Sequence, residues 1–156
     1  MIKTRILNAI AITIALGALF GVLFLLSAPI PSDWQNGGTL YIGQDKSINL
    51  RFADTPELRQ QGLSASSVLP LDQGLMFVFD TPAKPGFWMK DMHYPIDIIW
   101  INTKKRVVAI HAHVLPESYP QVLYPPTDVA YVLEINAGQA QKLGLVIGSK
   151  INFSVN

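Results

Sequence analysis

The chain has 156 residues, of which 49% are hydrophobic and 15% charged, and its formal net charge is +1. This length is enough for one globular domain and a short additional segment. The absence of cysteine excludes disulfides, iron–sulfur clusters, thiolate zinc sites and cysteine nucleophiles. From Thr39 to Asn156 ten Lys/Arg balance ten Asp/Glu, and no nucleic-acid-binding motif is present, so we predict no nucleic-acid partner.

The N-terminal segment is apolar enough to span a bilayer. Between Ile6 and Leu26 the only clearly polar residues are Asn8 and Thr13. A helix over this stretch would be about 31 Å long, which matches the hydrocarbon core of a membrane. Lys3 and Arg5 precede it, so the positive-inside rule predicts a cytoplasmic N-terminus and an extracytoplasmic remainder, periplasmic or extracellular.

A cleaved signal peptide is the alternative interpretation of this segment. The apolar stretch is longer than the roughly 7–15 residues of a signal-peptide core, and cleavage near Ser27-Ala28 would leave Pro29 directly after it. We therefore predict a transmembrane anchor or signal segment over residues 1–28, a linker over 29–38 and one β-rich domain over 39–156. The membrane is an expected partner through this helix.

The first half of the domain combines short strands with one brief helix. Alternating or continuous apolar runs predict strands at Thr39–Ile42, Ser47–Ala53 and Gly74–Phe79. A helix is predicted between the second and third strands, because Thr55 is a favourable N-cap and Pro56 suits the first helical position. Gly62 is placed to end that helix.

The second half continues in the same manner. Strands are predicted at Phe87–Lys90, Ile96–Ile101, Val107–Val114, Ala130–Ile135 and Lys150–Val155. A short helix is expected at Ala137–Leu143, and the proline-rich loop Leu115–Asp128 is either part of a binding site or a strap over the core. The predicted class is mainly β or α+β: a compact barrel-like or sandwich core with one or two short helices, plus the N-terminal transmembrane helix.

Four segments of this domain, taken together, are similar to one known family. They are Asp54–Leu63, Gly74–Phe79, Phe87–Ile101 and Val132–Gly138. In order and spacing they resemble the family called domain of unknown function 192. Ser64 replaces the methionine that this family usually has, and Asp91-Met92 replaces Asn-Thr. The resemblance implies a β-rich fold and names no activity. It draws attention to four polar residues within apolar motifs: Arg59, Lys90, Asp97 and Glu134.

Two of these acidic residues need an explanation from their surroundings. Asp97 opens an apolar strand, where a lone carboxylate is costly to bury without a partner, and Lys90 or Arg59 could supply that partner. Such a pair could be a structural clasp, a ligand anchor or a proton-transfer couple. Glu134 lies on the opposite strand face from its apolar neighbours, which is typical of the solvent side of a strand.

The histidines raise the question of a metal site. His111 and His113 are two residues apart on a predicted strand, so both side chains should project from the face opposite Val108, Ile110, Ala112 and Val114. With His93 they could form a three-histidine zinc site. The pair equally fits a solvent-exposed strand face, and we predict no metal and no cofactor.

These residues favour a binding domain without catalytic residues. Aromatic side chains with a few polar groups are typical of small-ligand pockets, although Trp88 and Trp100 could equally be core. The candidate ligand-binding residues are Arg59, Phe87, Trp88, Lys90, Tyr94, Asp97 and Glu134. The expected function is non-enzymatic small-ligand binding or an accessory role, with an unknown small molecule or envelope protein as partner. The alternative is a metal-assisted hydrolase that uses His111 and His113.

Overall fold

The computed structural model describes residues 37–64, 66 and 69–155. They belong to one compact unit, Asp33–Asn156. The predicted membrane anchor lies outside the described residues, and it stays a prediction. Within the described part of the chain, no helix is both long enough and apolar enough to cross a bilayer.

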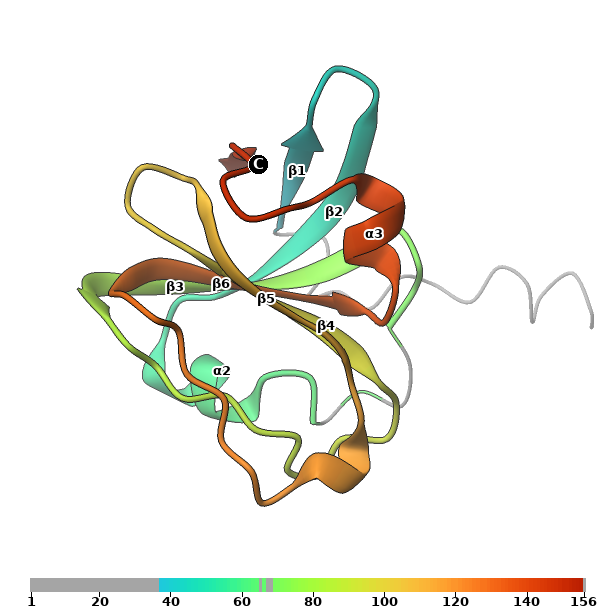
Figure 1. Cartoon of the computed structure of the whole chain (residues 1–156), viewed down its shortest axis with the longest axis vertical. Helices are drawn as coiled ribbons and strands as arrows, with labels where there is room; N and C mark the ends of the chain where they lie inside the picture. Colours follow the sequence, from blue (N-terminus) through green and yellow to red (C-terminus); the bar gives the residue numbers. More distant parts are fainter. Residues whose placement is uncertain (1–36, 65, 67–68, 156) are drawn as a thin grey trace, which may run out of the picture. The chain divides into compact units, whose positions relative to one another are not determined.

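In the described part of the chain seven strands form a single sheet, and two short α-helices and one 3₁₀ turn accompany it. The strands are β1 (Gly38–Ile42), β2 (Lys46–Ala53), β3 (Gln73–Ala83), β4 (Ile96–Ile101), β5 (Val107–Val114), β6 (Val129–Asn136) and β7 (Asn152–Val155). The helices are α2 (Pro56–Gln61) and α3 (Gln139–Leu143), with the 3₁₀ turn η2 at Pro116–Ser118. The strand order is β5-β4-β6-β3-β2-β1-β7 (Figure 1), and β2 and β3 are the parallel pair. The mainly β class with short helices is confirmed.

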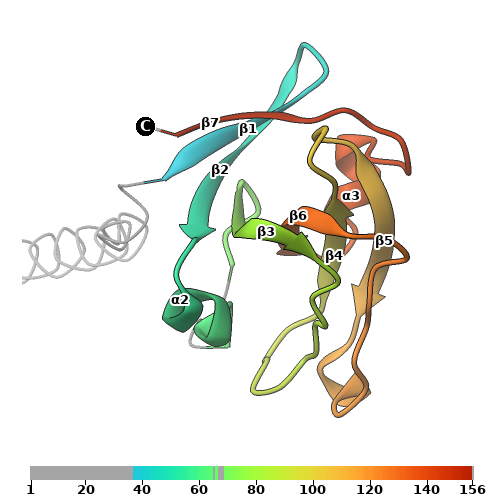
Figure 2. The same ribbon diagram turned by 90° about the vertical axis from the view of Figure 1, so that its left-hand side faces the viewer.

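Backbone hydrogen bonds join the two edges of the sheet. The amide of Val107 donates to the carbonyl of Ser149 at 3.0 Å, and the amide of Ile151 donates to the carbonyl of Lys105 at 3.0 Å. The start of β5 therefore pairs with the segment that leads into β7. Figure 2 shows this segment running across the top of the domain. This pairing satisfies backbone groups that an open sheet edge would expose.

Strand β4, between β5 and β6, is buried on both faces, which explains its largely apolar sequence. Ile98 and Trp100 pack in a core cluster with Leu63 and Phe87, residues of the segments that follow α2 and β3. Ile99 and Ile101 of β4 belong to a second core cluster, which includes Ala140 of α3. The domain thus has an apolar core on each side of β4, and Trp100 is a core residue.

Two strand predictions need correction. Phe87–Lys90 is not a strand: Phe87 makes one isolated bridge to Leu123, with backbone hydrogen bonds of 2.9 and 2.8 Å, because the proline-rich loop pairs with it at that point alone. In β5, the pairing with β4 shifts register near its end, where His113 has a φ of 57°. This irregularity interrupts the alternation of faces. The buried residues of β5 are therefore Val107, Ala109 and Val114, whereas Val108 and Ile110 are partly buried and Ala112 is exposed.

The start of α2 provides a direct test of the local sequence reasoning. The hydroxyl oxygen of Thr55 accepts a hydrogen bond from the amide of Leu58 at 3.2 Å, as predicted for an N-cap. Replacing Thr55 by alanine removes this acceptor, and we expect the free energy of unfolding to fall by about 1 kcal/mol. Denaturant unfolding would measure it. Thr103→Ala, at an exposed turn position, is the control and should change stability by less than about 0.5 kcal/mol; equal losses would contradict the capping role.

Candidate functional site

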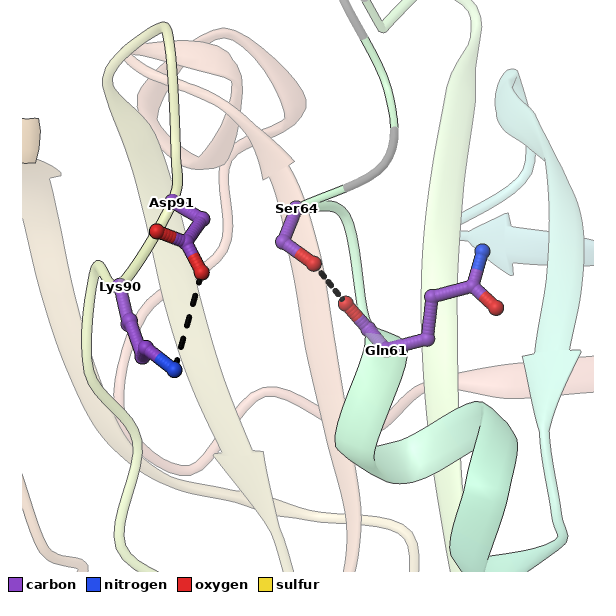
Figure 3. Close-up of polar contacts among 4 residues, drawn as sticks. All are labelled: Gln61, Ser64, Lys90 and Asp91. Atoms are coloured by element: carbon purple, nitrogen blue, oxygen red, sulfur yellow. Dashed lines mark hydrogen bonds and ion pairs between the residues drawn. The ribbon is translucent and has the colours of Figure 1, made fainter.

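A pocket of about 290 Å³ lies between the end of α2 and the loop that follows β3. The first wall consists of Gln60, Gln61, Gly62, Leu63 and Ser64, and the second of Gly86, Phe87, Trp88, Lys90, Asp91 and Met92. Glu134 of β6 also lines the pocket. Figure 3 shows the polar groups of the two walls, with Gln61 and Ser64 on one and Lys90 and Asp91 on the other. The site therefore combines aromatic, amide, hydroxyl and charged groups.

Two glycines allow the walls of this pocket to form. Gly62 ends α2 with a φ of 53° and donates its amide to the carbonyl of Leu58 at 2.9 Å, and a side chain would be strained in this conformation. On the other wall, a Cβ atom at Gly86 would lie 2.6 Å from Val122 and 2.7 Å from the ring of Tyr124. Glycine thus lets this wall pack closely against the proline-rich loop.

The rim of the pocket is exposed to solvent. Lys90 Nζ lies 3.8 Å from Asp91 Oδ2, and the two side chains are 54% and 72% exposed. Such an exposed pair contributes little to stability, so it is free to rearrange around a ligand. Trp88 is 55% exposed although it is one of the largest apolar side chains. An exposed indole beside polar groups provides a flat apolar surface for a bound molecule.

Glu134 is the most unusual residue of the site. Its side chain is 5% exposed, and Oε2 has no hydrogen-bond partner among the described residues. Burial raises the pKa of this carboxyl to about 8, although the positive charge of Arg51 acts in the opposite direction. The prediction that Glu134 faces solvent is wrong: β6 lies between β3 and β4, and Oε2 approaches the position of a Cβ at Gly62 to 4.0 Å.

Tyr94 belongs to the surroundings of this carboxyl. Burial is the main factor that raises the pKa of the Tyr94 hydroxyl to about 12, and the negative charge of Glu134 is the second. Ser66 and Arg51 lower it. The phenol therefore stays protonated at neutral pH. It supplies a neutral polar group in the electrostatic environment of Glu134.

Asp97 has a different position and a different role. Its fully buried carboxylate accepts hydrogen bonds from the backbone amides of His113 at 2.9 Å, Gly138 at 3.1 Å and Ala140 at 2.9 Å. These donors come from the end of β5 and the start of α3, so the side chain fastens both to β4. Three donors to one carboxylate are strong charge-assisted contacts that compensate its burial. Asp97 is thus a structural clasp outside the pocket.

The predicted ion pair of Asp97 with Lys90 or Arg59 does not form among the described residues. Arg59 Nη1 donates to the carbonyls of Asp54 at 2.7 Å and Val78 at 2.9 Å, and its guanidinium lies 5.4 Å from the ring centroid of Phe79. Lys90 lies beside Asp91 at the pocket rim. The backbone amides around Asp97 take the place of the expected cation.

The three histidines do not converge on a metal. His111 packs edge-on against Trp100, with ring centroids 5.1 Å apart, whereas His113 and His93 are exposed. In the described part of the chain, which includes all three histidines, no group of three or more ligating side chains could hold a metal ion. The structure therefore gives no support to the three-histidine site.

The structure brings together four of the seven candidate residues. Phe87, Trp88, Lys90 and Glu134 line the pocket. Tyr94 lies within electrostatic range of Glu134, and Arg59 and Asp97 lie elsewhere. Sequence reasoning missed the wall that follows α2, because a short loop after a helix has no periodicity. The departures from the family pattern were an available signal, since all three of those residues, Ser64, Asp91 and Met92, line the pocket.

The fold and this pocket define a small β-rich domain with a candidate binding site, and a family model matches most of the chain. Residues 39–153 match the DUF192 family, which is described as an uncharacterized ACR. The chain belongs to this family. No protein among the curated ones matches it.

Two solved structures have a similar fold. A protein of Sinorhizobium meliloti 1021 described as a "putative transcription regulator" is 28% identical, with a TM-score of 0.69 over 75% of this chain and 92% of that one. A protein of unknown function from Novosphingobium aromaticivorans DSM 12444 is 29% identical, with a TM-score of 0.68 over 74% and 83% of the two chains. Neither description gives a reaction or a ligand.

Proposed function

We propose that this domain binds a small ligand in the pocket between α2 and the Gly86–Met92 loop, without catalysing a reaction. The observation that carries the proposal is Glu134: a buried carboxyl that lines a cavity, with one oxygen unpartnered among the described residues. An unsatisfied buried polar group is costly, and its retention in a native structure calls for an explanation such as a function or a bound water or ion. A ligand that hydrogen-bonds to Oε2 would remove this cost.

The lining of the pocket supports a small, partly polar ligand. Its volume of about 290 Å³ is at the lower end of ligand pockets, which span roughly 300–1,000 Å³. Phe87 and Trp88 supply apolar contact, and the amide side chains of Gln60 and Gln61 supply donors and acceptors. Protonated Glu134 can donate to a carbonyl or hydroxyl oxygen, whereas its ionised form would accept from an amine or hydroxyl.

Ligand-observed NMR against a library of small polar molecules tests this function. We expect molecules that bind the wild-type chain to bind Trp88→Ala about tenfold more weakly, because tryptophan is enriched among the contacts whose removal costs more than about 1 kcal/mol of binding free energy. Binding to Glu134→Gln should also change. Tyr41→Ala, which removes an aromatic side chain that is 48% exposed on β1, is the matched control and should bind like the wild type.

The result that would refute this function is equally specific. If no molecule of the library binds, or if every bound molecule retains its affinity in both pocket variants, the pocket is not a ligand site. Thermal unfolding of each variant should accompany the binding measurements. An unchanged Tm for Trp88→Ala would attribute its effect to the ligand contact.

We also propose that the domain is tethered to a membrane and lies outside the cytoplasm. The support is the apolar stretch from Ile6 to Leu26 and the positive charges that precede it. Fractionation of cells that express the full chain with a C-terminal tag tests this location. Tagged chain in the membrane fraction, digested by protease added to cells with an opened envelope, would support it; protection from that protease would contradict it.

A further inference from the structure

The charges of the domain are segregated although their sum is zero. Three segments, Ile42–Lys46, Asn102–Val107 and Lys142–Ile151, contain six of its ten basic residues and Asp45 as the single acidic one. We call these segments the basic end. Its formal net charge is +5, whereas the rest of residues 39–155 carries four basic and nine acidic side chains, a net charge of −5. The basic side chains are Lys46, Lys104, Lys105, Arg106, Lys142 and Lys150.

Hydrogen bonds hold the three segments of the basic end together. Lys46 Nζ donates to the carbonyl of Lys142 at 2.7 Å, and Arg106 Nη1 donates to the carbonyl of Gly148 at 3.0 Å. In Figure 1 the β1–β2 hairpin, α3 and the β4–β5 loop lie in the upper half of the domain, and α2 beside the candidate pocket lies in the lower half. The basic end is therefore an ordered surface distinct from the pocket.

Two solvent-exposed apolar side chains lie on this basic surface. Val146 and Ile147 are 63% and 70% exposed at the tip of a turn. Ser149 closes the turn, because its amide donates to the carbonyl of Val146 at 2.9 Å and its hydroxyl accepts from the amide of Val146 at 3.0 Å. A shallow depression of about 370 Å³ next to this turn is lined by Lys46, Lys150 and Asp45 among others. Arg106 also reaches the turn, where it donates to the carbonyl of Gly148. The tip is thus held in place, with basic side chains of neighbouring segments close to its base.

We propose that the basic end docks on the surface of a bilayer that contains anionic phospholipids. Val146 and Ile147 would enter the boundary between head groups and acyl chains, where apolar side chains are stabilised, and the surrounding lysines would contact head-group phosphates. Nucleic acid fits this surface less well, because exposed valine and isoleucine gain nothing from a phosphate backbone. The neighbouring helix α3 has five residues, fewer than a groove-reading helix needs. This docking depends neither on the pocket ligand nor on the N-terminal anchor.

The test uses the domain without its N-terminal segment, since an apolar anchor would bind any bilayer. The matched fold makes up 92% of the Sinorhizobium meliloti chain, so a chain little longer than this domain folds on its own. Residues 33–156 are mixed with vesicles of phosphatidylcholine alone, or of phosphatidylcholine with phosphatidylglycerol, and sedimented. We expect binding to the anionic vesicles, weakened by added salt because screening reduces the attraction of exposed charges.

Matched variants separate this surface from a general charge effect. Lys150→Glu should lower the partition coefficient on anionic vesicles at least about fivefold, since one basic residue near such a surface contributes about that factor. Lys84→Glu makes the same charge change at an exposed lysine outside the basic end and should have a much smaller effect. Val146→Ser combined with Ile147→Ser should weaken binding without changing the charge. Circular dichroism verifies that each variant is folded.

Several results would overturn the docking. They are equal binding to both kinds of vesicle, equal losses in Lys150→Glu and Lys84→Glu, or no vesicle binding at all. Binding of inorganic phosphate or of duplex DNA in the absence of vesicle binding would also overturn it, because the surface would then recognise phosphate groups rather than a lipid surface. Retention of full vesicle binding by the Val146/Ile147 double variant would exclude insertion of the tip.

Discussion

Replacement of Asp97 by alanine is expected to lower the free energy of unfolding by about 3–5 kcal/mol. The fully buried carboxylate accepts three backbone hydrogen bonds, and its removal leaves the amides of His113, Gly138 and Ala140 without this acceptor. Each buried donor left unsatisfied costs about 1–3 kcal/mol, so the combined loss is large even if water enters the site. Urea unfolding at neutral pH measures the difference.

The matched control for Asp97 is Asp128→Ala, which removes an exposed carboxylate. It should change the free energy of unfolding by less than about 0.5 kcal/mol. Asp97→Asn retains one oxygen acceptor and should fall between the wild type and Asp97→Ala. If Asp97→Ala were as stable as the control, the carboxylate would not be a clasp between β4, the end of β5 and the start of α3.

Local rules predicted most of the elements of this fold, because each element has its own signal. The N-cap at Thr55 and the continuous apolar run of β4 were identified from neighbouring residues alone, and both are confirmed. Long-range pairing was beyond these rules. The hydrogen bonds between the start of β5 and the segment that precedes β7 join residues about 40 positions apart in the sequence, and the bridge that replaces the predicted strand at Phe87 joins two separate loops.

The candidate site was also predicted only in part, because local sequence patterns identify one wall of the pocket but not the residues that the fold brings to it. Phe87, Trp88 and Lys90 are adjacent in one distinctive motif, so the sequence identifies that wall of the pocket. Burial of an acidic side chain depends on what covers the strand from outside. Alternation assigned Glu134 to solvent, yet the turn at Gly62 lies over it. Asp97 was correctly expected to need compensation, but the donors are backbone amides, which sequence patterns do not reveal.

The basic end, too, could not be predicted from the sequence, because it depends on which segments the fold brings together. The equal numbers of acidic and basic residues gave no indication of a basic surface. The six cations come from three segments that are far apart along the chain, and only the tertiary structure makes them neighbours. Net charge thus describes the whole domain, whereas association with a charged partner depends on the local distribution of charge.

Glu134 should make the stability of the domain depend on pH. In the unfolded chain this carboxyl has its ordinary pKa of 4.5, whereas burial raises the pKa to about 8 in the folded domain. Between these values the folded state retains a proton that the unfolded state has released. The stabilisation that comes from this proton should therefore be fully present below pH 4.5 and be lost as the pH rises to about 8. The free energy of unfolding should fall by up to about 1.4 kcal/mol per pH unit in this range.

Glu134→Gln isolates this contribution, because the amide has nearly the same shape and stays neutral at every pH. The stability difference between the wild type and this variant should shift in favour of the variant by about 1 kcal/mol or more from slightly acidic to slightly alkaline pH. Urea unfolding at both ends of this range gives the difference. Glu117→Gln, at an exposed glutamate of η2, should keep the wild-type pH dependence. If Glu134→Gln also kept it, the carboxyl would titrate as an exposed group does, and the pocket would lose the buried carboxyl oxygen that supports the proposed ligand binding.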